Sequence, residues 1–262
     1  MSDAPRRESR WRGHVSDVRV SIVIPTHDEG EQIVPVLDRL LEAVTLPCEV
    51  LVVFDRPDDA TVPVVEAYAD KEPRVVPTLN TFGDGPANAI RFGIDRASAD
   101  VVVVTMADGS DDPRQIDDLT RLVERGVVVA AASRYMPGGQ QVGGAWLKQF
   151  LSRLAGLTLA WLARVGTRDA TNSFKAYSRR FVQEVGIHSR AGFEIGLEMV
   201  AKARRLRRPV AEIPTIWLER DQGVSSFKLV AWIPHYLRWY RFAFGPRVTV
   251  EQLRRAAERS AA

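Results

Sequence analysis

A run of β-branched residues in this 262-residue chain ends abruptly at a group of carboxylates. Val101–Thr105 is followed within a few residues by Asp108, Asp111 and Asp112. This layout is typical of a buried parallel strand that delivers acidic side chains to the crevice where open α/β sheets bind ligands. Carboxylates this close repel one another unless a cation or donors lie among them, so Asp108 is a candidate metal or nucleotide ligand. The residues also fit a helix start, with Asp111 or Asp112 as N-cap and Pro113 first in the helix. The two interpretations are compatible.

Two further expected strands also end in acid. Val18–Ile24 is followed by Asp28–Glu29, and Glu49–Phe54 is followed by Asp55. Because the carboxyl ends of parallel strands meet at one edge of a sheet, we expect these side chains to converge with Asp108. A lone aspartate after a strand is usually a turn residue. The prediction of a ligand site therefore depends on several of these acids meeting at one edge. Such an edge can hold a base and ribose through carboxylate acceptors, and a diphosphate through a divalent cation.

Strand and helix patterns alternate through the first half of the chain. The expected strands are Val18–Ile24, Glu49–Phe54, Arg74–Thr78, Val101–Thr105 and Val127–Ala132, and the expected helices are 33–41, Thr61–Ala69, Ala87–Ala97 and Ile116–Glu124. This rhythm predicts an α/β fold with a doubly wound, mostly parallel sheet flanked by helices. The second half predicts helices over Trp146–Val165 and Phe193–Arg208, a strand over Val210–Trp217, and an aromatic amphipathic helix over Phe227–Phe244.

Composition and charge bound the class of protein. A hydrophobic content of 45% and a charged content of 26% are ordinary globular values. The single cysteine, Cys48, excludes a disulfide framework and fits a reducing cytoplasm. No signal peptide and no apolar run of membrane-spanning length is visible. Residues 1–145 carry 15 basic and 24 acidic side chains (net −9), whereas residues 146–262 carry 21 and 9 (net +12). This split indicates an acidic half that holds a cation and a basic half that meets phosphate or an anionic surface, unless both are solvated faces.

Several segments have two interpretations. The aromatic helix Phe227–Phe244 predicts contact with a membrane surface, with a helix packed on the sheet as the alternative; Pro234 should kink it or delay its start. The basic cluster Lys202–Arg208 fits either a solvated face or contact with anionic lipid. The Gly83–Gly85 loop fits a phosphate cradle or a plain turn. Basic residues dispersed among apolar ones argue against a nucleic-acid partner. Oligomeric state is left open.

Six short segments, in order, resemble motifs of the family-two glycosyltransferases, which have the GT-A fold. They are Pro25-Thr26-His27-Asp28-Glu29, Asp108 as the second acid of a DxD signature, Ser133-Arg134-Tyr135 with Pro137-Gly138-Gly139, the segment 169–176, Glu198 within 192–198, and Ile213-Pro214 with the segment 219–228. The resemblance covers about residues 18–230 and is nearest to the dolichol- or polyprenyl-phosphate mannosyltransferase branch. It implies a GT-A domain over residues 18–228. A disordered basic arm over residues 1–17 would precede it, and a C-terminal amphipathic helix and tail over residues 229–262 would follow.

The resemblance also implies an activity. A sugar would move, with inversion, from a nucleotide-sugar such as GDP-mannose or UDP-hexose to a polyprenyl phosphate, in the cytoplasm at the inner face of the cell membrane. The implied catalytic residues are Asp108, Arg134, Asp169 and Arg220. The implied donor- and acceptor-binding residues are Pro25, Thr26, Asp28, Glu29, Asp55, Ala107, Asp108, Arg134, Arg220, Ser226 and Lys228. The implied ligands of Mg²⁺ or Mn²⁺ are Asp108, Ser110 and Asp111.

Two departures from the family pattern concern the donor site. Met106 stands at the first acid position of the DxD signature, and residues 54–57 replace the usual Asp-Asp-Gly-Ser after the second strand. A thioether is unsuited to a hard cation, so we expect Ser110 and Asp111 to supply the missing ligands.

Two alternative functions therefore remain open. The same fold could act on a glycan hydroxyl, which needs deprotonation and would make Asp169 or Glu198 a candidate base. The chain could also be a non-catalytic homologue that binds a nucleotide-sugar.

Overall fold

The computed structural model describes residues 17–143, 146–219 and 229–261. Residues 1–16 of the expected basic arm lie outside the described residues.

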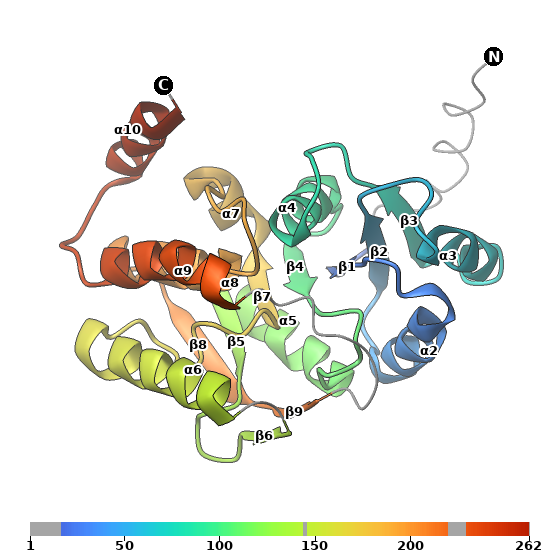
Figure 1. Cartoon of the computed structure of the whole chain (residues 1–262), viewed down its shortest axis with the longest axis horizontal. Coiled ribbons are helices and arrows are strands. Elements are labelled where there is room, and N and C mark those ends of the chain that lie inside the picture. The colour runs from blue at the N-terminus through green and yellow to red at the C-terminus, as the bar shows by residue number, and fades with distance from the viewer. Residues whose placement is uncertain (1–16, 144–145, 220–228, 262) are drawn as a thin grey trace.

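A seven-stranded sheet forms the centre of the molecule, with the strand order β3-β2-β1-β4-β7-β5-β8 (Figure 1). The strands are β1 (Val20–Pro25), β2 (Cys48–Phe54), β3 (Val75–Leu79), β4 (Val101–Val104), β5 (Val129–Ser133), β7 (Lys175–Ser178) and β8 (Val210–Pro214). Neighbouring strands are parallel, except that β7 runs antiparallel to both β4 and β5. The predicted mostly parallel sheet is confirmed. Strand β7 was not predicted.

Helices cover both faces of this sheet. They include α2 (Ile33–Ala43), α3 (Thr61–Ala69), α4 (Pro86–Arg96), α5 (Ile116–Glu124), α7 (Arg179–Val185) and α8 (Ile195–Arg205), with 3-10 turns η1 (Gly30–Gln32) and η2 (Pro113–Gln115). One apolar core joins α2, α3 and α5 to one face, and a second core joins α4, α7 and α8 to the other. The central strands are buried on both faces, which explains their continuous runs of valine and isoleucine.

The helix predicted over Trp146–Val165 is confirmed to within two residues of its end. It consists of α6 (Trp146–Thr158) and, directly after it, a π-helical turn, η3 (Leu159–Ala163). Gly166 then turns the chain (φ +87°) so close to Val210 that an added Cβ would lie 2.8 Å from the Val210 Cβ.

The single strand predicted over Val210–Trp217 is wrong, because it is broken at Thr215. Thr215 N donates to Ser133 O at 3.0 Å, the last hydrogen bond to β5, and Thr215 O accepts from Gln140 N at 2.9 Å. The next residues form β9 (Ile216–Leu218), which pairs with β6 (Gln140–Val142) in a separate two-stranded sheet.

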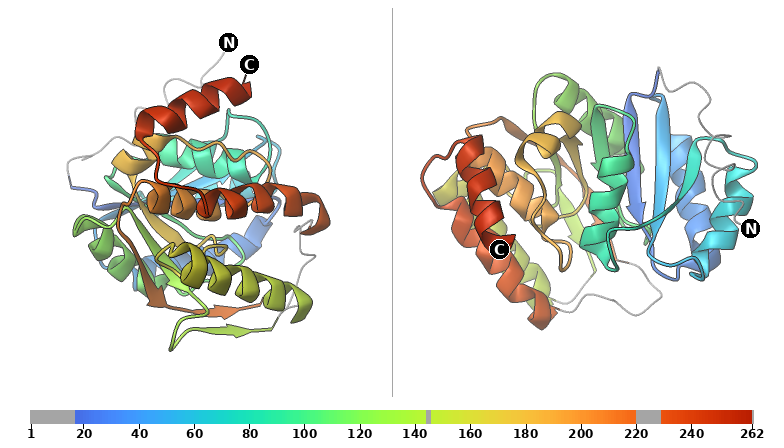
Figure 2. Two further views of the ribbon diagram at one scale, coloured as in Figure 1. Left: turned by 90° about the vertical axis from the view of Figure 1, so that its left-hand side faces the viewer. Right: turned by 90° about the horizontal axis from the view of Figure 1, so that it is seen from above.

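The C-terminal region packs against the rest of the molecule. Helix α9 (Leu229–Ala243) contains Pro234 and contacts α8, and Trp239 in its last turns is buried. The helix thus packs on α8, which itself covers the sheet, and its contact with a membrane surface stays a prediction. Residues of the expected tail form a further helix, α10 (Val250–Ala261). Figure 2 shows α6, α9 and α10 together on one side of the molecule.

Candidate active site

Hydrogen bonds from the next strand fix the loop that follows β1. The N–H and Oγ1 of Thr26 both donate to Val53 O, at 2.8 and 3.1 Å. Asp28 adopts a φ of +53°, which few non-glycine residues do. Its N–H donates to the buried Asp59 carboxylate at 3.0 Å, and its own carboxylate accepts from Ala60 N at 3.4 Å. Asp59, which the sequence did not single out, thus holds the turn that presents Asp28.

The neighbouring predicted residues lie at the same sheet edge. Pro25 ends β1, and Glu29 donates its N–H to Thr61 Oγ1 at 2.9 Å, at the start of α3. The Arg56 guanidinium lies 3.7 Å from the half-exposed Asp28 carboxylate. Because β1, β2 and β4 are parallel neighbours, the predicted convergence of their carboxyl ends is confirmed.

Asp55 organises the glycine loop before α4. Its Oδ1 accepts from Asn80 Nδ2 at 2.8 Å, and its Oδ2 accepts from Gly85 N at 2.7 Å. Asn80 Nδ2 also donates to Gly83 O at 2.8 Å. The Gly85 amide is thereby committed to Asp55, which favours the turn interpretation of this loop over a phosphate cradle.

The loop after β4 brings two carboxylates together. Asp111 is 5% exposed, and its Oδ2 accepts from Thr105 Oγ1 at 3.0 Å and from Met106 N at 3.2 Å. Asp108 is partly exposed and accepts from Ser110 N at 3.0 Å. Burial, and then the charge of Asp108, raise the pKa of Asp111 to about 7. A cation beside this pair would relieve the cost of ionising Asp111.

The donor atoms of this loop fit a hard cation that the substrate helps to hold. Ala107 and Ser110 are buried, and Ser110 Oγ has no hydrogen-bond partner within the described part of the chain. The same residues contain no group of three or more His, Cys, Asp and Glu side chains that could hold an ion. Mg²⁺ and Mn²⁺ accept carboxylate, hydroxyl and phosphate oxygens. Asp108, Ser110 and Asp111 therefore suit a cation whose coordination is completed by phosphate oxygens.

An arginine that the sequence did not single out fixes this loop. Arg39 of α2 donates through Nη2 to the carbonyls of Gly109 and Asp111. On the other side, Asp112 accepts from Arg114 N at 3.2 Å and is the N-cap of η2, so the helix-start interpretation is also confirmed. Nothing local marks Arg39, because its contact spans about 70 residues of chain.

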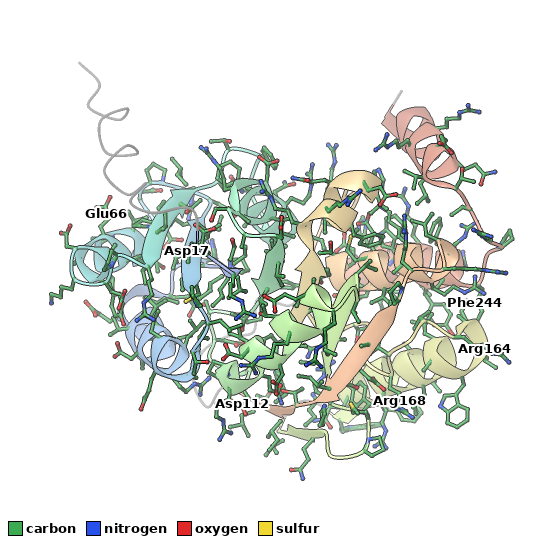
Figure 3. The ribbon with its side chains drawn as sticks, turned by 180° about the vertical axis from the view of Figure 1, so that it is seen from behind. Asp17, Glu66, Asp112, Arg164, Arg168 and Phe244 are labelled. Carbon is green, nitrogen blue, oxygen red and sulfur yellow. The ribbon has the colours of Figure 1, made fainter. Side chains whose placement is uncertain are left out.

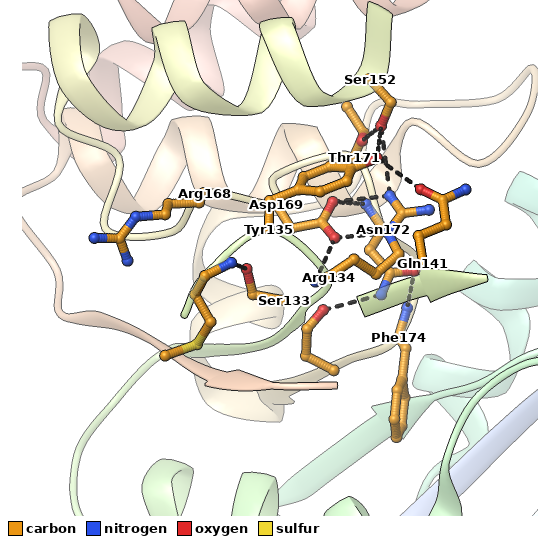
Figure 4. Close-up of polar contacts among 12 residues, drawn as sticks. Ser133, Arg134, Tyr135, Gln141, Ser152, Arg168, Asp169, Thr171, Asn172 and Phe174 are labelled. Atoms are coloured by element: carbon orange, nitrogen blue, oxygen red, sulfur yellow. Dashed lines mark hydrogen bonds and ion pairs between the residues drawn. The ribbon is translucent and has the colours of Figure 1, made fainter. Parts of the chain in front are cut away.

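A buried ion pair lies beyond β5 (Figure 4). Asp169 is fully buried, and its carboxylate accepts from Arg134 N, Nε and Nη2 at 3.0, 2.7 and 2.9 Å and from Asn172 N at 3.3 Å. Arg134 also donates to Ser152 Oγ of α6 at 3.4 Å, and its guanidinium lies 5.0 Å from the Tyr135 ring centroid. Both ionic partners were predicted from the sequence, whereas Ser152 was not.

The pair holds both groups in their charged forms. Burial alone would lower the pKa of Arg134 and raise that of Asp169, but their mutual charge and hydrogen bonds reverse both directions. Arg134 Nη1 has no hydrogen-bond partner among the residues that the structure describes. Arg134 thus has a donor to spare, whereas both oxygens of Asp169 are engaged.

The second candidate base is equally enclosed. Glu198 is fully buried, accepts from the N–H groups of His188 and Ser189 at 2.7 and 2.8 Å, and lies 2.5 Å from Lys202 Nζ. Burial opposes ionisation, but Lys202 and these hydrogen bonds lower the pKa of Glu198 to about 2. Neither Asp169 nor Glu198 is placed to take a proton from a substrate.

Three predicted site residues, Arg220, Ser226 and Lys228, lie outside the described residues. The chain leaves the described part close to the β4 loop, since Leu218 N donates to Ser110 O at 3.1 Å.

A doubly wound sheet whose carboxyl edge gathers acids is the arrangement at which open α/β folds bind their ligands. The chain belongs to glycosyl transferase family 2, whose model matches residues 21–186. The family recognised from the six motifs is confirmed, and the protein is a glycosyltransferase.

Named relatives share most of the chain. It is 29% identical over 214 residues to polyprenol monophosphomannose synthase of Mycolicibacterium smegmatis, covering 79% of this chain and 80% of that protein. It is 29% identical over 215 residues to undecaprenyl-phosphate mannosyltransferase of Micrococcus luteus, covering 80% and 87%. Dolichol-phosphate mannosyltransferase of Pyrococcus furiosus is 28% identical over 214 residues, which cover 80% of this chain and 60% of that protein.

Solved structures confirm the GT-A fold. Glucosyl-3-phosphoglycerate synthase from Mycobacterium tuberculosis, in complex with Mn²⁺, UDP and glucosyl-3-phosphoglycerate, matches with a TM-score of 0.63 at 17% identity, covering 89% of this chain and 82% of that one. A mannosyltransferase from Pyrobaculum calidifontis, in complex with GDP-Man and Mn²⁺, matches with a TM-score of 0.60 at 18% identity, covering 97% and 74%.

Proposed function

We propose that this glycosyltransferase moves a hexose, with inversion, from a nucleoside-diphosphate sugar to a polyprenyl phosphate. Two of the three relatives are named as undecaprenyl-phosphate and dolichol-phosphate mannosyltransferases, and the third as a polyprenol monophosphomannose synthase, which supports this acceptor class. The observation that carries the proposal is the pairing of a buried arginine that has a free Nη1 with a carboxylate that has no free oxygen.

The acceptor class follows from this pairing. A hydroxyl acceptor must lose a proton in the transition state and needs a carboxylate or imidazole within reach. Asp169 and Glu198, the two candidate bases, are fully buried and already accept hydrogen bonds from protein groups. A phosphate acceptor is already anionic and needs positioning, which the guanidinium of Arg134 supplies. Asp169 acts in this proposal as a positioning residue for Arg134.

The donor would lie across the edge formed by β1, β2 and β4. Pro25, Thr26, Asp28, Glu29 and Asp55 would face its base and ribose. Asp55 still has lone pairs for a base N–H, because each of its oxygens accepts one hydrogen bond within the described chain.

Departure of the nucleoside diphosphate needs stabilisation of growing negative charge. Mg²⁺ or Mn²⁺ held by Asp108, Ser110 and Asp111 would supply it when bound. Ala107 and Arg39 shape the loop that carries these ligands. Arg220, Ser226 and Lys228 remain proposed phosphate ligands.

An apolar surface supports work at a membrane. Four large side chains of α6 and η3 are strongly exposed: Trp146 at 76%, Phe150 at 57%, Trp161 at 71% and Leu162 at 70%. Helix α9 adds exposed residues on the same side of the molecule (Figure 2). Exposed apolar patches of this kind are typical of interaction sites. No helix among the described residues is long and apolar enough to span a bilayer. We propose peripheral attachment through this surface, called the apolar face, to the inner face of the cell membrane.

The test is transfer of radiolabel from GDP-mannose, UDP-glucose and related donors to polyprenyl phosphate in the presence of Mn²⁺. The proposal predicts label in the organic phase and none on soluble glycans. Label on a glycan hydroxyl, or no transfer with any donor, would contradict it.

A further inference from the structure

A cavity of about 760 Å³ lies between the end of α8 and the start of α10. Its lining includes Arg207, Arg208 and Arg247 but no acidic side chain. We call it the arginine cavity. It is open to solvent along much of its extent, so it suits a ligand that stays partly exposed. In Figure 1, α10 lies at the upper left and the β6–β9 sheet at the bottom, and none of the residues that line the cavity belongs to the candidate active site.

The arginine cavity is formed by part of the basic cluster Lys202–Arg208. Lys202 is buried against Glu198. Arg204 and Arg205 donate to backbone carbonyls, at 2.8 Å to Ala163 and 2.7 Å to Pro246. The last two arginines of the cluster line the cavity instead. The cluster is therefore neither a uniform solvated face nor a single patch.

Two of the three cavity arginines are available to a ligand. Arg208 pairs with Glu184 at 3.1 Å. Arg207 and Arg247 are exposed and make no side-chain hydrogen bond or ion pair within the residues that the structure describes. Two unpaired guanidinium groups in one cavity favour an anion, and their planar donors match phosphate oxygens.

The start of α10 adds to this positive potential. Thr249 and Gln252 cap the helix reciprocally, with Thr249 N donating to Gln252 Oε1 at 2.9 Å and Gln252 N to Thr249 Oγ1 at 3.3 Å. Both residues line the cavity, so the positive end of the helix dipole faces it together with the arginines.

The surroundings of the cavity indicate where the anion comes from. Phe244, which is 40% exposed, lies three residues before Arg247, and Figure 3 shows it on the same side of the molecule as Arg164 at the end of η3. Arg204 donates to the carbonyls of Ala163 in η3 and of Gly245, so the end of η3 lies beside the chain segment that leads to Arg247 and the cavity. A protein that docks by the apolar face would bring the arginines to the level of lipid headgroups.

We propose that the arginine cavity is a second, non-catalytic phosphate site that takes the headgroup of an anionic phospholipid. The proposal rests on the membrane orientation given under the proposed function, but its test does not require glycosyl transfer. The apolar face would be attracted to any bilayer. Binding of a headgroup in the arginine cavity would add a preference for anionic lipid.

The first experiment is flotation with phosphatidylcholine vesicles that contain or lack phosphatidylglycerol. The R207Q/R247Q variant should lose about 25-fold in partitioning onto the anionic vesicles, at about fivefold for each arginine near the surface. Binding to pure phosphatidylcholine should not change. The control variant K71Q/R125Q removes the same charge from exposed positions outside the cavity and should change partitioning less than threefold. Equal losses in both variants would overturn the proposal, since the effect would then belong to net charge.

The second experiment separates a lipid headgroup from free phosphate. Calorimetric titration with dihexanoyl phosphatidylglycerol should give binding that R207Q/R247Q abolishes, with inorganic phosphate at least tenfold weaker. Equal affinity for both ligands would overturn the headgroup assignment. The same variant should transfer sugar to detergent-solubilised polyprenyl phosphate at the wild-type rate. A rate that fell with lipid binding would contradict a non-catalytic site, whereas inactivity of the wild type would refute only the proposed function.

Discussion

Replacing Asp169 by asparagine removes the charge that holds Arg134. Asp169 is fully buried and accepts four hydrogen bonds, three of them from Arg134. The side chain of asparagine keeps one acceptor oxygen, but its NH₂ group would face N–H groups of Arg134 or Asn172. These groups can only donate, so they cannot pair with the NH₂ group. At least two hydrogen bonds are therefore lost, and the guanidinium remains buried without its counter-ion.

The expected cost follows from these contacts. Two charge-assisted hydrogen bonds at about 1.5–3 kcal/mol each give about 3–6 kcal/mol, and breaking a buried ion pair from one side costs about 3–5 kcal/mol. D169N should thus lower the free energy of unfolding in urea by about 4 kcal/mol. Transfer should fall about hundredfold because Arg134 is no longer positioned, with a raised KM for the phosphate acceptor and little change for the donor.

Two control variants test the stability cost of the unpaired charge, and the kinetics of D169N separate a positioning role from general-base catalysis. The double variant R134M/D169L removes both partners of the ion pair and leaves no guanidinium without its counter-ion, so it should be more stable than D169N, although transfer should be at least as slow. The surface variant D118N breaks the ion pair between Asp118 and Arg121. Because the Asp118 side chain is 65% exposed, the free energy of unfolding should fall by less than about 1 kcal/mol. If D169N kept wild-type stability and acceptor KM but lost kcat and the acidic limb of its pH profile, Asp169 would be a base and our reasoning would be wrong.

Three further predictions concern other parts of the molecule. The pKa of Glu198, lowered from 4.5 to about 2 in the folded protein, contributes about 3 kcal/mol of stability above pH 4.5 that is lost as the pH falls toward 2. Urea unfolding of E198Q should show lower stability at pH 7 and a shallower loss below pH 4.5; an unchanged acid limb would refute this. D108N should raise the Mn²⁺ concentration for half-maximal transfer at least tenfold, and an unaltered Mn²⁺ titration would exclude Asp108 as a ligand. Replacing the exposed Trp161 and Leu162 by serine should weaken co-sedimentation with vesicles by about 2–4 kcal/mol without altering the melting temperature, whereas undiminished co-sedimentation would mean that η3 does not touch the bilayer.

Local patterns predicted the regular first half of the fold. Runs of valine and isoleucine marked the buried parallel strands, and helices α3 and α5 have the predicted bounds. Strand β7 was missed because its four residues are held by partners about 45 and 75 residues away, in β5 and β4. The break at Thr215 was missed for the same reason, since its hydrogen bonds run to Ser133 and Gln140.

The candidate site divides in the same way. Acids at strand ends could be predicted, because parallel strands bring their carboxyl ends to one edge. The resemblance to the family supplied Arg134 and Asp169, but the sequence could not reveal that they neutralise each other. The supports of the site, Arg39 and Asp59, act through contacts with distant loops and have no local signal.

Acceptor competition tests the central claim most directly. The purified protein is incubated with labelled nucleotide-sugar, Mn²⁺ and equal amounts of a polyprenyl phosphate and the corresponding polyprenol, and the lipid products are separated. We expect label on the phosphate alone, since Asp169 and Glu198, the two candidate bases among the described residues, are buried with their carboxylates already engaged. Label on the polyprenol, or on neither lipid with any common nucleotide-sugar, would contradict it.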